Sequence, residues 1–361
     1  MIAAFSDVFA DVTKQGTKLQ TSEYLASGKY PIIDQGQDDI AGYTDRENGL
    51  FTDVPAIIFG DHTRIVKYVD KPFFLGADGV KVLKATIPDV DCRYLYYAVS
   101  AVKIPNTGYN RHFKWLKEAQ IPLPDISTQR RIADTLDKVS EGIEVCRKML
   151  GELDLMVKAK FVEMFGDPVS NEREWNVETL NDVCTEIGDG LHGTPEYDDN
   201  GEYPFINGNN LINGAIEITP ATKKVNAEIY KKHYIDISAN ALLLSINGTL
   251  GKLAFYNGEK VMLGKSACYC NFKPEINRAF VYGVMKTEAF AGFLEKSATA
   301  STIKNVGLKA IRGYKLIMPP QALQMQFIEF SNQVDKSKLA VKQSLEKLET
   351  LKKSLMQEYL G

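Results

Sequence analysis

The sequence predicts an α+β protein made of two tandem α/β globular units and two long helices, with the two helices paired as an antiparallel coiled coil. The main observation is a repeat, because residues 124–166 align without a gap on residues 319–361. Both segments have the apolar spacing of long helices, whereas the regions before them alternate short β-rich runs with Gly, Asn and Asp. The predicted boundaries are 1–123 and 167–318 for the globular units, and 124–166 and 319–361 for the helices.

A coiled-coil seam is expected in both long segments. Apolar residues of the first recur in alternating steps of four and three, and those of the second keep seven-residue spacing in one row although polar residues interrupt the other. Each helix has about 36 residues after its start, which is on the order of 54 Å at ~1.5 Å per residue. The seam includes Ile132, Leu136, Val139, Ile143, Phe327, Val334, Val341 and Leu348.

The connection between the helices indicates how they pair. Gly166 followed by Pro168 is typical of a helix end, so the second globular unit should begin near Asn171. The second helix then starts where the first one ended and has a matched length, so the two seams are buried best in an antiparallel pair that returns Gly361 to the neighbourhood of Met1. The alternative is that each helix packs separately against its own globular unit.

The globular units have the pattern of mixed domains. Strands are expected at 56–59, 64–69, 241–246 and 252–256, and helical stretches near 93–99 and 278–294. The repeat extends into these units, since Tyr-Pro-Ile-Ile at 30–33 matches Tyr-Pro-Phe-Ile at 203–206, and Gly76 matches Gly264. The residues between the shared positions differ, as expected for a common scaffold with divergent loops.

Composition excludes several classes of protein. With 361 residues, of which 44% are hydrophobic, the chain can bury two ordinary cores. It has no apolar run of ~18 residues and no secretory pattern at its start, so we expect a cytoplasmic protein without a membrane partner. The five cysteines show no paired spacing, which favours reduced structural thiols over disulfides or a zinc site.

Motifs of catalysis are not found. Residues 258–266 resemble a phosphate-binding loop but have one residue too many between the glycines, so a turn between strands is the stronger interpretation. His62, His112, His192 and His233 stand in four separate contexts without metal-ligand spacing. No catalytic residue, metal site or cofactor is therefore predicted, and the chain is expected to be a binding protein.

The distribution of charge favours DNA as the partner. The net charge of −3 argues against it, because phosphate neutralisation requires Lys and Arg. However, residues 92–117 and 296–328 contain no Asp or Glu, and each stretch carries five basic residues at matching places in the repeat. A charge bias alone usually marks a solvated surface, but its duplication favours DNA contact. The expected contact residues are Asn106, Tyr109, Asn110, Arg111, His112 and Lys114 in the first copy, and Ser301, Thr302, Lys304, Asn305 and Lys309 in the second.

Several motifs taken together resemble a known family. Ile-Pro-Leu-Pro at 121–124 and Gln-Arg-Arg-Ile at 129–132 lead into the first long helix, and Phe-Gly-Asp-Pro at 165–168 is followed by Trp175 and by Leu-Asn-Asp-Val at 180–183. With the repeat, this combination resembles the specificity subunit of type I restriction-modification systems over nearly the whole chain. The first copy departs from the pattern because Phe5-Ser6-Asp7-Val8 has no preceding counterpart of Trp175.

The resemblance implies a function that belongs to an assembly. Each globular unit would be a target-recognition domain for one half of a split site in double-stranded DNA, and the helices would be a spacer that docks two methyltransferase subunits through seam residues. Those subunits would bring S-adenosylmethionine, and restriction subunits would bring ATP and Mg²⁺ chemistry, so this chain would be a non-catalytic subunit without cofactors of its own. Two alternatives stay open: the specificity subunit of a related type II enzyme that cuts on both sides of its site, and a coiled-coil adaptor that does not bind DNA.

Overall fold

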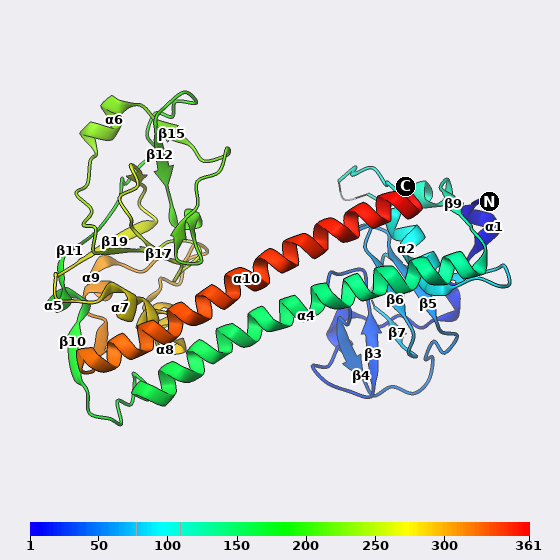
Figure 1. The fold of residues 1–361 in the computed structure, drawn as a ribbon, viewed down its shortest axis with the longest axis horizontal. Coiled ribbons are helices and arrows are strands. Elements are labelled where there is room, and N and C mark those ends of the chain that lie inside the picture. The colour runs from blue at the N-terminus through cyan, green and yellow to red at the C-terminus, as the bar shows by residue number, and fades with distance from the viewer. Residues whose placement is uncertain (77, 109) are drawn as a thin grey trace. The chain divides into compact units, whose positions relative to one another are not determined.

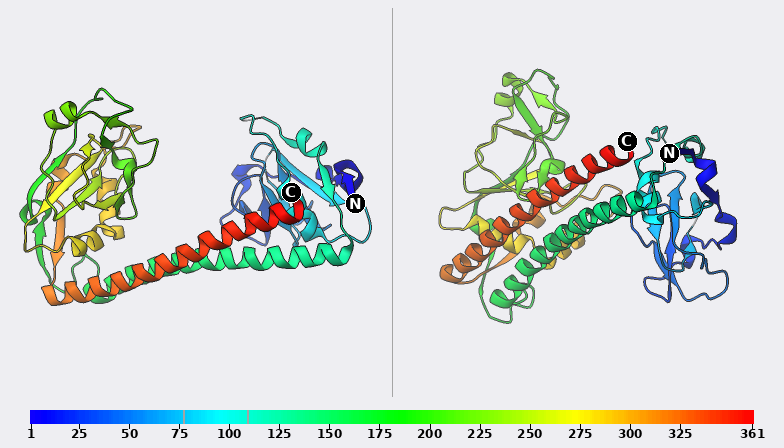
Figure 2. Two further views of the ribbon diagram at one scale, coloured as in Figure 1. Left: turned by 45° about the horizontal axis from the view of Figure 1, so that its top comes forward. Right: turned by 45° about the vertical axis from the view of Figure 1, so that its right-hand side comes forward.

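The computed structural model describes residues 1–76, 78–108 and 110–361. By its internal contacts the chain divides into two compact units. The first comprises Met1–Met149 with Val341–Gly361, and the second comprises Leu150–Ala340. Each unit therefore contains one globular part and a portion of both long helices. The first unit holds both ends of the chain, as the N and C labels show in Figure 2.

The two long helices are α4 (Ile126–Phe165) and α10 (Gln321–Leu360), each of 40 residues, or about 60 Å at ~1.5 Å per residue. Their starts are built alike, as the ungapped repeat predicts. The side chain of Gln129 donates to the carbonyl of Pro124 at 2.8 Å, and that of Gln324 donates to the carbonyl of Pro319 at 2.8 Å. Both glutamines are buried, and Pro319 is buried as well, whereas Pro124 is half-buried.

The helices run antiparallel in both units, as Figures 1 and 2 show. In the first unit Arg147 of α4 forms an ion pair with Glu349 of α10 at 3.0 Å. In the second unit Phe161 of α4 lies 5.4 Å from Phe327 of α10, measured between ring centroids. Later residues of α4 therefore contact earlier residues of α10, as in an antiparallel pair. The predicted antiparallel pairing is confirmed, and the end of α10 packs against the core of the first unit.

The seam residues occupy the interior of this arrangement. Ile132 and Leu136 belong to the core of the first unit, and Phe327 belongs to the core of the second. Burial corrects the expected role of most of them in binding partner proteins, because a buried side chain has little area to offer a second chain. The buried seam residues are Ile132, Leu136, Val139, Ile143, Phe327 and Val334, whereas Val341 and Leu348 are half-buried.

In the globular part of the first unit (Figure 1), the sheets run in the orders β2-β8-β5-β6, β4-β3-β7 and β1-β9. Helix α2 (Cys92–Ala101) covers the sheet that contains β5 and β6. The strands are β1 (Ile2–Ala4), β2 (Phe9–Asp11), β3 (Tyr30–Ile33), β4 (Gly42–Thr44), β5 (Ala56–Gly60), β6 (Val66–Val69), β7 (Phe74–Leu75), β8 (Val80–Ala85) and β9 (Gln120–Pro122). The short helices are α1 (Phe5–Val8) and α3 (Phe113–Lys117), with 3-10 turns at Thr13–Gln15 and Thr21–Glu23.

The second unit repeats this plan, with sheets in the orders β11-β19-β16-β17, β15-β12-β18 and β10-β20, and adds the hairpin β13-β14. Its strands are β10 (Asn176–Thr179), β11 (Cys184–Asp189), β12 (Tyr203–Ile206), β13 (Leu211–Ile212), β14 (Ala215–Ile216), β15 (Lys224–Val225), β16 (Ala241–Ser245), β17 (Leu253–Phe255), β18 (Met262–Leu263), β19 (Ala267–Phe272) and β20 (Lys315–Met318). Its helices are α5 (Leu180–Val183), α6 (Ala227–Lys232), α7 (Arg278–Met285), α8 (Glu288–Ser297) and α9 (Leu308–Arg312), with a 3-10 turn at Gly208–Asn210.

The repeat is visible in backbone hydrogen bonds. β3 pairs in parallel with β7, as β12 does with β18, and the amides of Gly76 and Gly264 donate to Ile33 and Ile206 at 2.8 Å each. The strand at 262–263 lies within the segment that resembles a phosphate-binding loop, which supports the turn-and-strand interpretation of that segment. One expectation was wrong in detail: the helical stretch near 278–294 is two helices, α7 and α8, because Thr287 caps the second.

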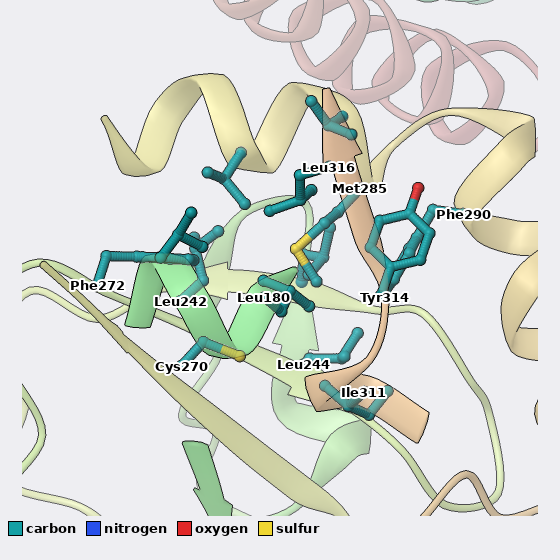
Figure 3. Close-up of a cluster of buried hydrophobic side chains, with 14 of the residues drawn as sticks. Leu180, Leu242, Leu244, Cys270, Phe272, Met285, Phe290, Ile311, Tyr314 and Leu316 are labelled. Atoms are coloured by element: carbon teal, nitrogen blue, oxygen red, sulfur yellow. The ribbon is translucent and has the colours of Figure 1, made fainter. Parts of the chain in front are cut away.

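A hydrophobic core fills each unit. In the second unit (Figure 3), Leu242 and Leu244 of β16 lie with Leu180 of α5, Met285 of α7 and Leu316 of β20. Helices and strands from the whole length of this unit thus share one core. All five cysteines are free, and burial raises the pKa of Cys92, which is only half-buried, to about 11. The described part of the chain contains no helix suited in length and polarity to crossing a membrane.

The buried glutamines at the helix starts carry a testable prediction. Replacing Gln324 by alanine should lower the free energy of unfolding by about 1–3 kcal/mol, because the buried carbonyl of Pro319 loses its donor. Gln129→Ala should cost more, since Gln129 also accepts from the amide of Asp91 at 3.0 Å. Urea unfolding measures both effects, with Gln326→Ala as a matched control at an exposed position of the same helix turn. Equal midpoints for all three variants would show that these side chains do not hold the helix starts.

Candidate nucleic-acid interface

In the first unit, the expected DNA-contact residues lie around the loop between α2 and α3. Asn110, Arg111 and Lys114 are exposed and line a groove of about 560 Å³ together with Thr107 and Trp115. The ammonium group of Lys114 lies 4.1 Å from the ring centroid of Trp115. The groove therefore combines positive charge, amide and hydroxyl groups with an aromatic surface, which are the groups that contact phosphates and bases.

Asn106 is exposed, and its side chain accepts from the amide of Gly108 at 3.2 Å, so it shapes the loop. Tyr109, which we expected at the same surface, lies outside the described residues.

His112 is not at the surface, which corrects the expectation that it contacts DNA. Its side chain is fully buried and its ring packs against Trp115 with centroids 5.5 Å apart. Its Nδ1 lies 3.0 Å from the carbonyl oxygen of Asp61. A side chain in this position cannot reach a base edge, so His112 stabilises the loop from the interior of the unit.

The turn between β5 and β6 fixes this loop from the other side. The amide of His112 donates to the carbonyl of Asp61 at 2.7 Å, and the amide of Phe113 donates to the Asp61 carboxylate at 2.7 Å. Arg64 in the same turn has a positive φ of 64° and donates to the carbonyl of Ile104. Two segments distant in sequence thus form one surface.

In the second unit, the corresponding loop joins α8 to α9 and is rich in hydroxyl groups. Ser301, Thr302 and Lys304 are exposed, and Asn305 is half-buried. The Ser301 hydroxyl donates to the carbonyl of Ile303 at 2.7 Å, which tightens the loop. Lys309 is exposed on α9, the short helix that follows this loop.

The positive charge of both surfaces is smaller than the linear sequence indicates. Arg93 forms ion pairs with Asp91, Asp134 and Asp137. Burial disfavours the charged guanidinium, but hydrogen bonds to these three carboxylates outweigh burial and raise the pKa of Arg93. In the second unit, Lys304 pairs with Glu295. Folding thus places carboxylates beside basic residues of stretches that contain no Asp or Glu. Among the expected contact residues, the strongest basic surface is therefore formed by Arg111 and Lys114.

Sequence reasoning missed Trp115 and the turn between β5 and β6. Trp115 stands between the basic residues Lys114 and Lys117, and an aromatic residue among basic ones is a signal that could have found it. This turn lies far from the loop in sequence, since Asp61 and His112 are 51 residues apart. No local pattern links them. The described residues hold no group of three or more His, Cys, Asp or Glu side chains arranged for a metal ion.

Comparison with known families decides the relationship. The family model described as the type I restriction modification DNA specificity domain matches residues 4–154 and 172–351. The chain belongs to this family. It carries two such specificity domains, one for each copy of the repeat, and the resemblance inferred from its motifs is confirmed.

Individual relatives agree with this assignment. The chain is 25% identical over 217 residues to the specificity subunit of the type I restriction enzyme EcoR124I/EcoR124II from Escherichia coli, an alignment that covers 54% of this chain and 52% of that protein. The match thus spans about half the length of this curated relative. The type I S subunit from M. genitalium shares the fold, with a TM-score of 0.56 and 18% identity over 100% of this chain and 96% of that one. A chain solved in work on assembly and conformational transition of the type I R-M system has a TM-score of 0.55 and 16% identity, covering 100% and 97%.

Proposed function

We propose that this type I specificity protein reads a bipartite sequence in double-stranded DNA, with one short block for each specificity domain and a spacer between the blocks set by α4 and α10. The observation that carries the proposal is the repeated surface. In the first unit the β5–β6 turn is hydrogen-bonded to the loop before α3, and in the second unit the β16–β17 turn is hydrogen-bonded to the loop before α9. The two units share the same arrangement of strands and loops, but their exposed side chains differ. This is what two domains that recognise different DNA sequences require.

We further propose that the chain acts as the non-catalytic subunit of an assembly. Two methyltransferase subunits would supply S-adenosylmethionine, and restriction subunits would supply ATP and Mg²⁺ chemistry. Because the seam is buried, these partners would dock on the outer faces of the helices. Exposed apolar side chains on α4 support this view, namely Val145, Met149, Leu155, Met156 and Val162.

Methylation mapping tests the split target. Genomic DNA from cells that express the chain with its methyltransferase partner should carry a modified motif of two specific blocks separated by non-specific bases. Single-molecule sequencing of modified bases reads such a motif directly, with cells that lack this chain as the control. A single contiguous motif would contradict the two-reader proposal.

The basic residues provide a second prediction for the same assembly. Replacing Arg111 and Lys114 by alanine should reduce the slope of log affinity against log salt by about two, because each lost phosphate contact removes roughly 0.9. Lys304→Ala with Lys309→Ala should have a smaller effect, since Lys304 is already paired with Glu295. Filter binding at several salt concentrations measures the slopes. Unchanged slopes in both double variants would assign these residues to an ordinary solvated surface.

A further inference from the structure

Two loops of the second unit form one recognition surface through a pair of asparagines. Asn247, in the turn between β16 and β17, forms an antiparallel bridge with Asn305 in the loop before α9. The amide of Gly248 donates to the carbonyl of Lys304 at 2.9 Å, and the amide of Val306 donates to the carbonyl of Ile246 at 2.9 Å. Backbone bonds on both sides of the asparagines therefore hold the two loops in register.

The turn itself is tied to the body of the unit by hydrogen bonds. Gly248 has a positive φ of 75°, and a side chain at this position would meet no atom within 4 Å, so the turn projects into open space. The hydroxyl of Ser245 donates to the carbonyl of Thr249 at 2.6 Å and accepts from the amide of Lys252 at 2.8 Å. Because Ser245 is fully buried, these bonds anchor the turn to the core of the unit.

The side chains of the two asparagines are joined as well. Nδ2 of Asn247 donates to Oδ1 of Asn305 at 3.3 Å, and both residues are half-buried. One amide-to-amide bond uses one nitrogen and one oxygen, whichever way each amide is oriented. The pair therefore keeps one carbonyl oxygen and one NH₂ group for a further partner.

We infer that Asn247 and Asn305 together read one adenine in the half-site of the second unit. An acceptor beside a donor is the complement of the major-groove edge of adenine, which presents the N6 amino donor next to the N7 acceptor. This inference rests on the proposed function and extends it, because it assigns specificity to the β16–β17 turn as well as to the loop before α9.

The first unit does not carry the same pair. Its turn places Asp61 against the loop, where the carboxylate accepts from the buried amide of Phe113. The amide of Asn110 instead bonds within its own loop, to Thr107. In the first unit the turn is joined to the loop by backbone amides that donate to Asp61, so the reading of adenine by an asparagine pair is assigned to the second half-site.

The experiment uses the full chain in complex with its methyltransferase partner and its own mapped target. Each base pair of the second half-site is replaced in turn, and binding is measured for the wild type, Asn247→Ala and Asn305→Ala. Both variants should lose roughly 5- to 150-fold discrimination at the same A·T pair, the range of one bidentate base contact. Discrimination at other positions, and the salt dependence, should be unchanged.

Three controls make the result decisive. Asn200→Ala changes an exposed asparagine of the same unit whose backbone amide, and not its side chain, makes the turn bond to Asp198. The variant Asn305→Asp keeps the shape of the side chain and replaces a donor by an acceptor, so it should lose the same preference if the alanine variants fold poorly. Non-specific DNA binding by each variant reports that the complex is intact.

The outcomes separate two kinds of failure. If the wild-type complex prefers a split target and the Asn247 and Asn305 variants keep every preference of it, the adenine inference is wrong and the proposed function stands. Loss of preference at two different base pairs, or at a G·C pair, also overturns the inference. If the wild-type complex shows no sequence preference, the proposed function itself fails.

Discussion

Replacing Leu355, Met356, Tyr359 and Leu360 together by alanine should unfold the first unit near physiological temperature. These residues of α10 pack against the core that Phe5, Tyr94 and Ile132 form in the first unit. Each is half-buried, so each substitution should cost about 1–2 kcal/mol, and the four together about 4–8 kcal/mol. A typical domain is stable by only 5–15 kcal/mol, so the loss is comparable to the whole stability.

Hydrogen exchange measured by mass spectrometry locates this effect. Amides of α2 and β5 in the first unit should lose protection, while those of β16 and β19 in the second unit should keep it. The matched control replaces the exposed neighbours Lys353, Ser354, Gln357 and Glu358 by alanine, which removes little buried surface. Full protection of α2 in the quadruple core variant would show that the first unit folds without the end of α10.

The sequence predicted the long helices and their pairing because their signals are local and repeated. An ungapped repeat of residues 124–166 on 319–361 gives two helices of equal length, and both have 40 residues. The seam then required a partner, and matched length made the antiparallel arrangement the natural one. Strands at 56–59 and 241–246 were predicted for the same reason, since short apolar runs between turn residues are recognised without tertiary information.

The candidate interface could be predicted only in part, because burial and pairing are tertiary properties. His112 and Arg111 are neighbours in sequence, yet one is fully buried and the other exposed. Arg93 looked free in a stretch without acids, but α4 supplies Asp134 and Asp137. Asn247 gave no signal at all, since its relation to Asn305 depends on a bridge across 58 residues.

Removing one heptad from each long helix should shift the preferred DNA spacer. The deletions are 143–149 in α4 and 338–344 in α10, which lie around the boundary between the two compact units. The antiparallel register on either side is kept, because the same number of residues leaves both helices. Seven residues at ~1.5 Å each shorten the pair by roughly 10 Å.

The size of the shift follows from the geometry of DNA. At ~3.4 Å per base pair, the optimal spacer should shrink by up to about three base pairs, or by fewer if the helices run oblique to the DNA axis. The deletions also rotate the two domains relative to each other, which lowers affinity for every spacer. Deleting the heptad from α4 alone is the control, since it breaks the register of the pair.

The most direct test is therefore a spacer scan. Binding of the assembly with the doubly shortened chain is measured on targets that keep both specific blocks and vary the spacer one base pair at a time. The account predicts an optimum at a shorter spacer than that of the wild type. If the shortened chain folds, binds its target and still prefers the original spacer, α4 and α10 do not set the distance between the two readers.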